Sequence, residues 1–426
     1  MSGKEEEIEI RLPRIRIRAF NAPPEFITAL IIAIAASVAT GLRAWATATG
    51  PFSHGYISDE VYYATIAEKM AVYMFGYVGP VHAPASGIGY SYWNLEHPPL
   101  AKYIIALALM AQHSPYAVAW RVPSVILTSL EPLIIFLGIT LGNPRDVRRL
   151  IGGAVGAMVF PAETITATVG ALALLDTYAA FFITLAVALA INRRWGLAAI
   201  AMGLALASKE TALPFVLALA IYYYLNSNET LRDRLITSLA LILGPIAIAA
   251  LSYAPIVAYL GLKNTVLGIE TTLHWDLQNR PSGPLPSSPV DWFFGINAMI
   301  GGIITETIKA GDNYIVRQLL LRFSMNPYVE APAFIIALGY FVYTLLMRRA
   351  VPRDLGTVFL VTGFVIFSIV FIFNHTFYSF YSIVFVPVTA MIWSEVISSV
   401  YPGIRSVRRA IGAFLSALAE EAEKGA

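Results

Sequence analysis

Apolar segments long enough to cross a lipid bilayer recur along this chain. A transmembrane helix needs about 20 apolar residues, and ten segments reach or approach that length: 26–48, 118–141, 150–167, 172–191, 195–208, 211–226, 235–260, 331–347, 356–373 and 377–398. The 426 residues are 57% hydrophobic and 13% charged, whereas roughly a quarter of the residues in soluble domains are charged. We therefore predict an all-α polytopic membrane protein with about 10 to 12 transmembrane helices.

The composition also excludes several classes of protein. The net charge is +2 and the basic residues occur in short clusters between apolar segments, so no nucleic-acid partner is expected. The chain has no cysteine, which excludes disulfides, thiolate metal sites and a cysteine nucleophile. Residues 1–25 lack the apolar core of a cleaved signal peptide and are predicted to be a basic cytosolic arm. Residues 26–400 form the predicted transmembrane domain, and 401–426 an amphipathic tail on the cytosolic surface.

Basic clusters between the apolar segments indicate how the chain is oriented. Arginines precede segment 26–48, which places the N-terminus in the cytosol by the positive-inside rule. Segment 100–111 is short for a span, and the later basic clusters all become cytosolic only if it does not cross. We predict that it lies in the outer leaflet and that two large external loops cover about 50–117 and 261–330. The protein would be a multi-pass protein of the plasma membrane, or of the endoplasmic reticulum membrane in a eukaryote.

Ionisable side chains from five separate segments meet at the predicted external face: Asp59-Glu60, Glu96-His97, Arg121, Asp176 and Lys209. Such residues are costly at membrane depth and mark functional sites. Arg and Lys bind phosphate, and a carboxylate would accept the proton of an attacking hydroxyl. The grouping predicts an acid–base site for an anionic lipid headgroup.

Each of these residues also has a structural interpretation. Arg121 would anchor a helix end, and Asp176 would pair with a neighbouring cation. Lys209 and Glu210 would pair with each other at a helix turn. The pair Glu68-Lys69 fits the solvated face of a loop helix.

Two further observations leave alternatives open. Asp59, Glu96 and His97 would serve as ligands of a divalent ion, although their spacing matches no recognised metal motif. Aromatic residues enrich both external loops, which fits either sugar binding or an interfacial belt. The second loop has a helical pattern over 303–322.

Several short motifs occur together and in order. They are D-E-x-x-Y from Asp59, E-H-P-P-L-A-K at 96–102, W-R-V-P-S at 120–124, L-L-D-T-Y-A-A-F-F at 174–182, A-S-K-E-T at 207–211, His274, S-P-V-D-W at 288–292 and Asn326-Pro327. In combination, over about 26–395, the sequence resembles the protein O-mannosyltransferase family. That family belongs to the GT-C class of integral-membrane glycosyltransferases, which use polyprenyl-phosphate sugars. The lipid A aminoarabinose transferases are similar at the same places, with Glu-Lys-Pro-Pro where this chain has 96–99.

The resemblance implies a GT-C fold and roles for individual residues. The catalytic set would be Asp59, its acidic neighbour Glu60, and Asp176. The donor-phosphate and substrate-binding set would be Arg121, Lys209, His97, Glu96, Lys102 and His274. Two departures affect acceptor and partner recognition: loop 261–330 is too short for the carbohydrate-binding-like domain of the eukaryotic enzymes, and Asn374-His375 replaces an expected basic residue.

The implied reaction is an inverting transfer of one sugar, with mannose as the prediction. The donor would be a dolichyl- or polyprenyl-phosphate sugar and the acceptor a protein Ser or Thr hydroxyl, with no cofactor required and a divalent cation as the open alternative. A lipid or glycan acceptor is the alternative within this class. A transporter or lipid flippase is the alternative from another class, but polar groups gathered at one face disfavour a transporter, whose site lies near the midplane.

Overall fold

The computed structural model describes residues 23–82, 88–89, 91–276, 286–310, 313–373 and 377–402. Within this part of the chain, six helical segments are long and apolar enough to cross a membrane. They are α1 (Pro24–Thr49), α4 (Ala117–Thr140), Leu231–Leu260, α14 (Pro327–Met347), α15 (Leu355–Phe373) and Ser379–Pro402, which begins with the short helix η4 (Ser379–Phe385). The predicted polytopic helical membrane fold is therefore confirmed.

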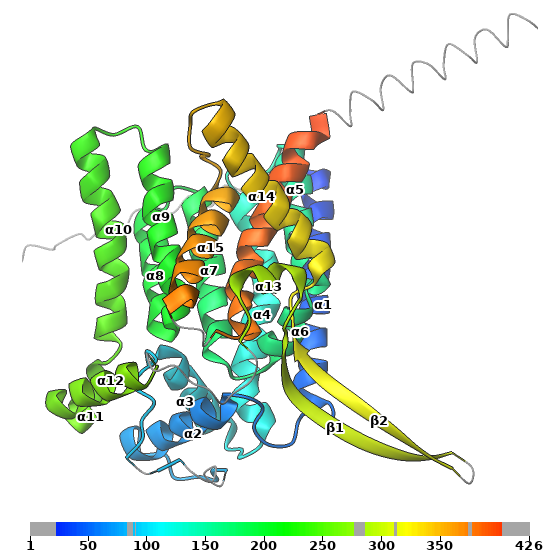
Figure 1. Cartoon of the computed structure of the whole chain (residues 1–426), viewed down its shortest axis with the longest axis vertical. Coiled ribbons are helices and arrows are strands. Elements are labelled where there is room, and N and C mark those ends of the chain that lie inside the picture. The colour runs from blue at the N-terminus through cyan, green and yellow to red at the C-terminus, as the bar shows by residue number, and fades with distance from the viewer. Residues whose placement is uncertain are drawn as a thin grey trace, which may run out of the picture.

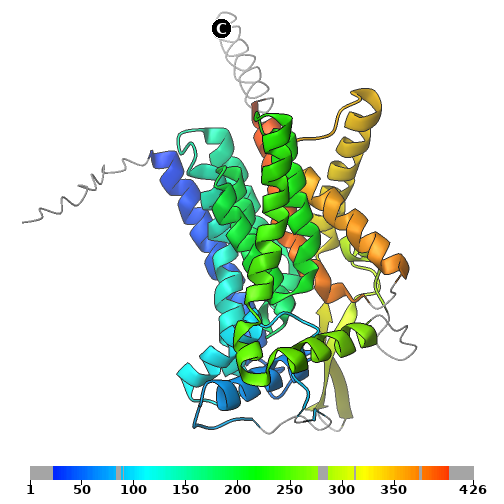
Figure 2. The same ribbon diagram turned by 90° about the vertical axis from the view of Figure 1, so that its left-hand side faces the viewer.

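The remaining predicted spans are also helical. The pair α5 (Val147–Ala162) and α6 (Thr164–Thr168) is bent by 59° and forms a seventh candidate span together with η2 (Val169–Ala171). The shorter helices α7 (Leu175–Ile191), α8 (Trp195–Ser208) and α9 (Leu213–Asn226) run beside the longer ones in both views (Figures 1 and 2). Segment 235–260 lies within the candidate span Leu231–Leu260, in which a short break separates α10 (Leu231–Leu251) from α11 (Ala254–Leu260).

Short helices of the two large loops, together with α11 at the end of the span Leu231–Leu260, gather at one end of the bundle, which we call the loop end (bottom of Figure 1). These are α2 (Glu60–Lys69), η1 (Met70–Met74), α3 (Leu100–Gln112), α11 and α12 (Leu262–Asp276). Tyr103 and Tyr253 tie the loops to α10, since each hydroxyl donates across the boundary, to Ser252 O and Leu95 O respectively, at 3.2 Å. Helix α3 thus packs against the end of the bundle.

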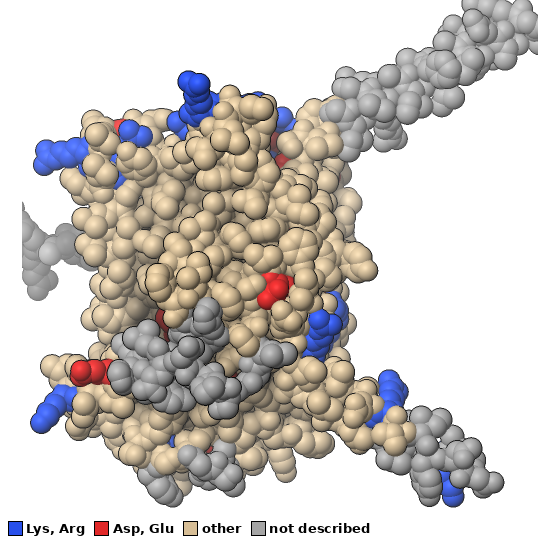
Figure 3. Space-filling view, viewed as in Figure 1, with Lys and Arg blue, Asp and Glu red and all other residues tan. Residues whose placement is uncertain are grey.

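The connections α4–α5, α7–α8, α9–α10 and α14–α15 lie together at the other end, which we call the basic end (Figure 1). The four basic clusters that follow segment 118–141 lie in or next to these connections, whereas the arginines before segment 26–48 are outside the described residues. In Figure 3 Lys and Arg side chains gather along the top edge of the molecule. The prediction that these clusters share one side is confirmed; their assignment to the cytosol remains a prediction.

The second loop contains a β-hairpin where the sequence pattern predicted a helix. Strands β1 (Met299–Ala310) and β2 (Asn313–Phe323) pair antiparallel, with Ile303 opposite Leu320. The prediction for 303–322 is therefore wrong. The segment is rich in β-branched residues, which favour a pleated strand, and alternate apolar residues satisfy a period of two as well as a helical period.

Small residues let the central helices approach closely. Gly138 on α4 packs against α7, and a Cβ atom at this position would lie 2.6 Å from Ala188 Cβ. Close backbone approach at small residues is how membrane helices gain packing energy. This contact holds α4 against α7, the two helices that carry Arg121 and Asp176. The predicted arm 1–22 and most of the tail, 403–426, lie outside the described residues.

Candidate active site

Asp59 begins α2 at the loop end. Its backbone carbonyl accepts hydrogen bonds from Tyr62 N and Tyr63 N at 3.0 and 3.1 Å, and Ser58 before it has a φ of 53°. The turn places the Asp59 side chain, which is partly exposed, within electrostatic range of Tyr63 and Lys209. The predicted catalytic carboxylate therefore faces a buried cation.

Lys209 is that cation, and it is fully buried between α8 and α9. Its Nζ lies 3.2 Å from Tyr63 Oη, 3.0 Å from a ring nitrogen of His97 and 3.4 Å from Glu210 Oε1. Burial works against the charge, but Glu210, Asp176 and Asp59 together raise the pKa of Lys209 above its ordinary value. The side chain is therefore an ammonium at neutral pH.

His97 and Glu210 form the exposed rim of this cluster. His97 Nδ1 lies 3.0 Å from Glu210 Oε2, and 14% of the His97 side chain and 48% of the Glu210 side chain are exposed. Although burial opposes it, His97 and Lys209 hold the pKa of Glu210 below its usual range. The rim thus carries an ionised carboxylate next to Lys209 Nζ.

Asp176 comes from the first turn of α7 and is fully buried. Its Oδ1 accepts a hydrogen bond from Thr211 Oγ1 at 3.0 Å, while no described residue donates to its Oδ2. An orphaned buried carboxylate oxygen is unusual and indicates a site for a ligand or water. The structure therefore brings Asp59, Asp176, Lys209 and His97 together, as the sequence predicted.

Glu60 and Arg121 are close to this cluster but saturated by each other and by the backbone. Arg121 donates to Glu60 Oε1 at 2.9 Å and to Glu60 Oε2 at 2.6 Å, and its other N–H groups donate to carbonyls of Ala48, Phe52 and Gly55. Glu60 also accepts from Ala173 N at 2.9 Å and from Ile57 N at 3.0 Å. A catalytic Glu60 and a phosphate-binding Arg121 do not fit this geometry, because every donor of the guanidinium is occupied.

Lys102 and Glu96 make hydrogen bonds within the turn that carries His97. Lys102 is fully buried, and its Nζ donates to Asn94 O, Asn94 Oδ1 at 3.0 Å and His97 O at 2.9 Å. Glu96 Oε1 accepts from Tyr92 Oη and from Asn94 Nδ2, both at 2.5 Å. The donors of Lys102 are all used to hold the turn, with Asn94 at a φ of 49°, that presents His97, so we revise its predicted substrate-binding role. Glu96 Oε2 is buried with no donor among the described residues, so the substrate-binding role of Glu96 stays a prediction.

The structure gives fewer details, or a different position, for the remaining predicted residues. His274 lies in α12, but its side chain is outside the described residues, as are Asn374 and His375. No three His, Asp or Glu side chains of the described residues group as a metal site, so Asp59, Glu96 and His97 are not assembled as one. The expectation of a solvated Glu68 is wrong, because Glu68 is 6% exposed and its Oε1 accepts from His82 N at 2.9 Å.

Sequence reasoning did not assign three neighbours of Lys209 and Asp176 to the site. Thr211 belongs to the A-S-K-E-T motif and Tyr63 to D-E-x-x-Y, so both could have been found from those motifs. The ring of Tyr381 lies with its centroid 5.6 Å from Lys209 Nζ. Nothing in the sequence pairs Tyr381 with Lys209, since they are joined only by the fold.

Comparison with known proteins supports the resemblance drawn from the motifs. Residues 96–259 match the family described as dolichyl-phosphate-mannose-protein mannosyltransferase. None of the curated proteins matches this sequence.

Solved structures share the fold. The oligosaccharyltransferase of Archaeoglobus fulgidus in the apo form aligns at a TM-score of 0.50 and 12% identity, over 91% of this chain and 52% of that one. ArnT from Cupriavidus metallidurans in the apo state aligns at 0.50 and 17% identity, over 84% of this chain and 58% of that one. The chain thus spans little more than half the length of these proteins.

A third structure is the Pmt1-Pmt2 protein O-mannosyltransferase complex of S. cerevisiae bound to the sugar donor, with a TM-score of 0.40 and 19% identity over 63% of this chain and 36% of that one. The family match over 96–259 covers four of the motifs and includes His97, Asp176 and Lys209. Together the matches show that this chain has the GT-C fold of integral-membrane glycosyltransferases and resembles the dolichyl-phosphate-mannose-protein mannosyltransferase family.

Proposed function

We propose that this protein is an inverting glycosyltransferase that moves one sugar from a polyprenyl-phosphate donor to a hydroxyl acceptor. The observation that carries the proposal is the buried ammonium of Lys209, which sits between the carboxylates of Asp59, Asp176 and Glu210 at the loop end. A cation beside a carboxylate supplies what this transfer needs: charge neutralisation of a phosphate and a base for a hydroxyl.

We assign the following roles. The hydroxyl oxygen of the acceptor attacks the anomeric carbon of the donor while the bond from that carbon to the phosphate oxygen breaks. Asp59 takes the hydroxyl proton, and the polyprenyl phosphate leaves with the bonding electrons and its negative charge. Lys209 stabilises that charge, with His97 next to it at 3.0 Å. Phosphate is already a good leaving group, so positioning and neutralisation do most of the work.

The finer specificity rests on the family match. We propose mannose as the sugar, dolichyl phosphate as the carrier and protein Ser or Thr as the acceptor, in line with the matched family's description. The site would face the external or luminal side, because the basic end would face the cytosol. Asp176 would keep Lys209 charged, and its orphaned Oδ2 would accept a hydrogen bond from a sugar hydroxyl.

The test is transfer by the purified protein. It is incubated with labelled dolichyl-phosphate-mannose and, in parallel, with a Ser/Thr-rich peptide, a lipid acceptor and a glycan acceptor. Label on the peptide, absent with an Asp59→Asn variant, supports the whole proposal. Label on the lipid or glycan retains the reaction and changes the acceptor. If the protein transfers sugar to none of these acceptors, from dolichyl-phosphate-mannose or from other polyprenyl-phosphate sugars, the proposal is refuted.

A further inference from the structure

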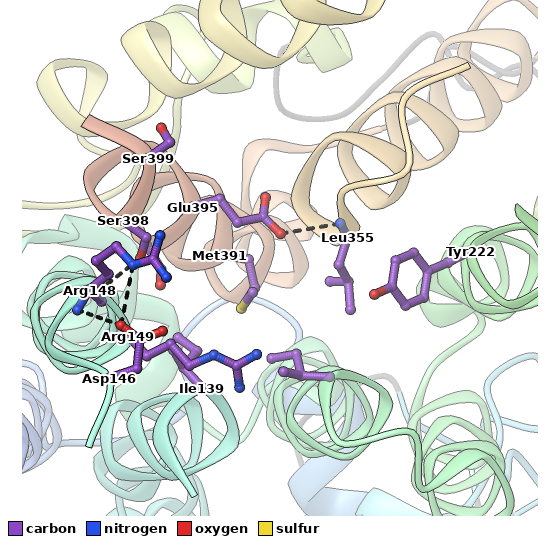
Figure 4. A pocket seen from close by; sticks show the side chains of 12 residues that line it. Ile139, Asp146, Arg148, Arg149, Tyr222, Leu355, Met391, Glu395, Ser398 and Ser399 are labelled. Atoms are coloured by element: carbon purple, nitrogen blue, oxygen red, sulfur yellow. Dashed lines mark hydrogen bonds and ion pairs between the residues drawn. The ribbon is translucent and has the colours of Figure 1, made fainter. Parts of the chain in front are cut away.

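A cavity with charged side chains in its lining lies at the basic end of the bundle, at the opposite end from the candidate active site. Its volume is about 460 Å³, within the usual range of ligand sites. The cavity is enclosed by the start of α5, by α9 and the start of α15, and by the last helix (Figure 4). Its apolar lining comes from Ile139, Ile191, Leu355 and Met391.

One wall of the cavity is cationic. Arg148 donates from Nε to Asp146 Oδ1 at 3.3 Å, and its backbone carbonyl accepts from Ser398 Oγ at 3.1 Å. Arg149 has no hydrogen-bond or ion-pair partner among the described residues, and Figure 4 shows it pointing into the cavity. Asp146 lies within electrostatic range of both arginines. Two guanidinium groups that share one carboxylate keep a net positive charge, and adjacent guanidinium groups are an arrangement that binds a phosphate group.

The opposite wall is acidic. Glu395 accepts hydrogen bonds from Leu355 N at 3.2 Å and Gly356 N at 3.4 Å, at the start of α15. The carboxyl of Asp354 lies beside it and accepts from Thr357 N at 2.8 Å through Oδ1, while Oδ2 is buried without a donor among the described residues. Two adjacent carboxyl groups repel each other unless a proton or a cation lies between or beside them.

Charges of both signs therefore face one cavity at a bundle end. We propose that it binds a zwitterionic phosphate ester in which a phosphate and a primary amine are joined by a short linker, as in the headgroup of an aminophospholipid. The phosphate contacts Arg149 and Arg148, and the ammonium group donates to Glu395, with the Tyr222 side chain next to it. The apolar lining takes the carbon chain of the linker and the glycerol.

The two walls of the cavity disfavour headgroups that lack either the phosphate or the primary amine. A headgroup that is only anionic leaves the carboxyl of Glu395, which lines the cavity, uncompensated. A quaternary ammonium has no N–H to donate to Glu395. The position at the end of apolar helices favours a membrane lipid as the source over a free phosphate ester, and the shared chemistry allows both to be tested.

The experiment measures lipid retention by native mass spectrometry of the purified protein after equilibration with phosphatidylethanolamine, phosphatidylglycerol or phosphatidylcholine of the same acyl chains. We expect about a tenfold preference for phosphatidylethanolamine. Arg149→Gln should reduce its retention about tenfold, and Glu395→Gln should remove the preference over phosphatidylcholine and raise phosphatidylglycerol retention. Arg145→Gln, a change in the same connection at a residue that does not line the cavity, should alter nothing.

Two controls distinguish loss of lipid binding from loss of folding. Thermal melting of each variant shows that it is folded, and Arg149→Lys, which keeps the charge, should restore part of the retention. Soluble glycerophosphoethanolamine, which has the headgroup but no acyl chains, is tested by thermal shift. If it raises the melting temperature at the concentration at which the lipid does, the site binds a free ester. If only the lipid raises the melting temperature, the site binds the lipid. Equal retention of all three lipids by wild type, or unchanged phosphatidylethanolamine retention by Arg149→Gln, would overturn the proposal.

Discussion

Arg121 and Glu60 form a two-point ion pair in which neither side chain is exposed, with Nε–Oε1 at 2.9 Å and Nη2–Oε2 at 2.6 Å. The pair joins α4 to the start of α2, directly after Asp59, and Glu60 continues the contact to Ala173 before α7. A fully buried pair is costly to break because removing one partner leaves an uncompensated charge. Its position makes it the clamp that fixes the first loop against the bundle.

Arg121→Ala should therefore destabilise the protein by about 3 to 5 kcal/mol. The measurement is thermal melting in detergent, with Asp59→Asn as the matched change that leaves the clamp intact and should melt like wild type. If Arg121→Ala melts like wild type but fails to bind a donor analogue, the side chain binds phosphate after all and the clamp assignment is wrong.

Asp59→Asn should lower the transfer rate by roughly 10²- to 10⁴-fold, which is the usual contribution of a general base. The amide has nearly the same shape but takes no proton, so donor affinity and melting temperature should stay close to those of wild type. Initial rates and donor binding are measured on the same preparation. Near wild-type transfer by this variant would move the base to another carboxylate, with Asp176 as the first candidate.

Lys209→Gln should weaken binding of the donor phosphate by about 2 to 5 kcal/mol, as expected for a buried charge partner. Lys263→Gln is the control, because Lys263 is exposed on α12. Titration with a non-hydrolysable donor analogue distinguishes the two variants. Unchanged affinity in a folded Lys209→Gln protein would show that this ammonium only balances its neighbouring carboxylates.

Glu68 should make stability depend on pH. Burial raises the pKa of Glu68 from 4.5 to about 7, so the folded protein holds a proton that the unfolded chain releases at lower pH. The stabilising effect of that proton is complete below about pH 4.5 and is lost as the pH rises through 7, by on the order of 3 kcal/mol. Glu68→Gln should therefore melt higher than wild type at pH 8 and nearly the same at pH 5. If the two melting temperatures differ by the same amount at pH 5 and at pH 8, the raised pKa of Glu68 is contradicted.

Segment 100–111 should not cross the bilayer. The chain has no native cysteine, so single cysteines at Ser114 and Asn143 report on their own positions. An impermeant thiol reagent added to sealed, right-side-out membranes should label the cysteine at Ser114 and leave that at Asn143 unlabelled until the membrane is opened. The reverse pattern, or labelling of both from one side, would contradict the predicted orientation.

The sequence alone determined the class of fold. It also predicted which residues lie together in the candidate site. Runs of apolar residues can be buried only in lipid or in other helices, so their lengths predicted the ten helical segments, which the described residues show. The predicted topology, which puts these segments at one external face, and the family motifs grouped Asp59, His97, Asp176 and Lys209 in one predicted site. These features depend on local composition and on short linear spacing, which a sequence displays directly.

Only the tertiary structure decided which charged residues are free to act. Arg121 and Lys209 look equivalent in the sequence, but the backbone carbonyls and Glu60 saturate the first, while the second faces side chains of the site. The hairpin β1–β2 similarly depended on pairing between residues of two strands, such as Ile303 with Leu320, whose apolar pattern fits two periods. The physical reason is the same in both cases: hydrogen bonds and burial are satisfied by partners distant in sequence, and only the fold specifies those partners.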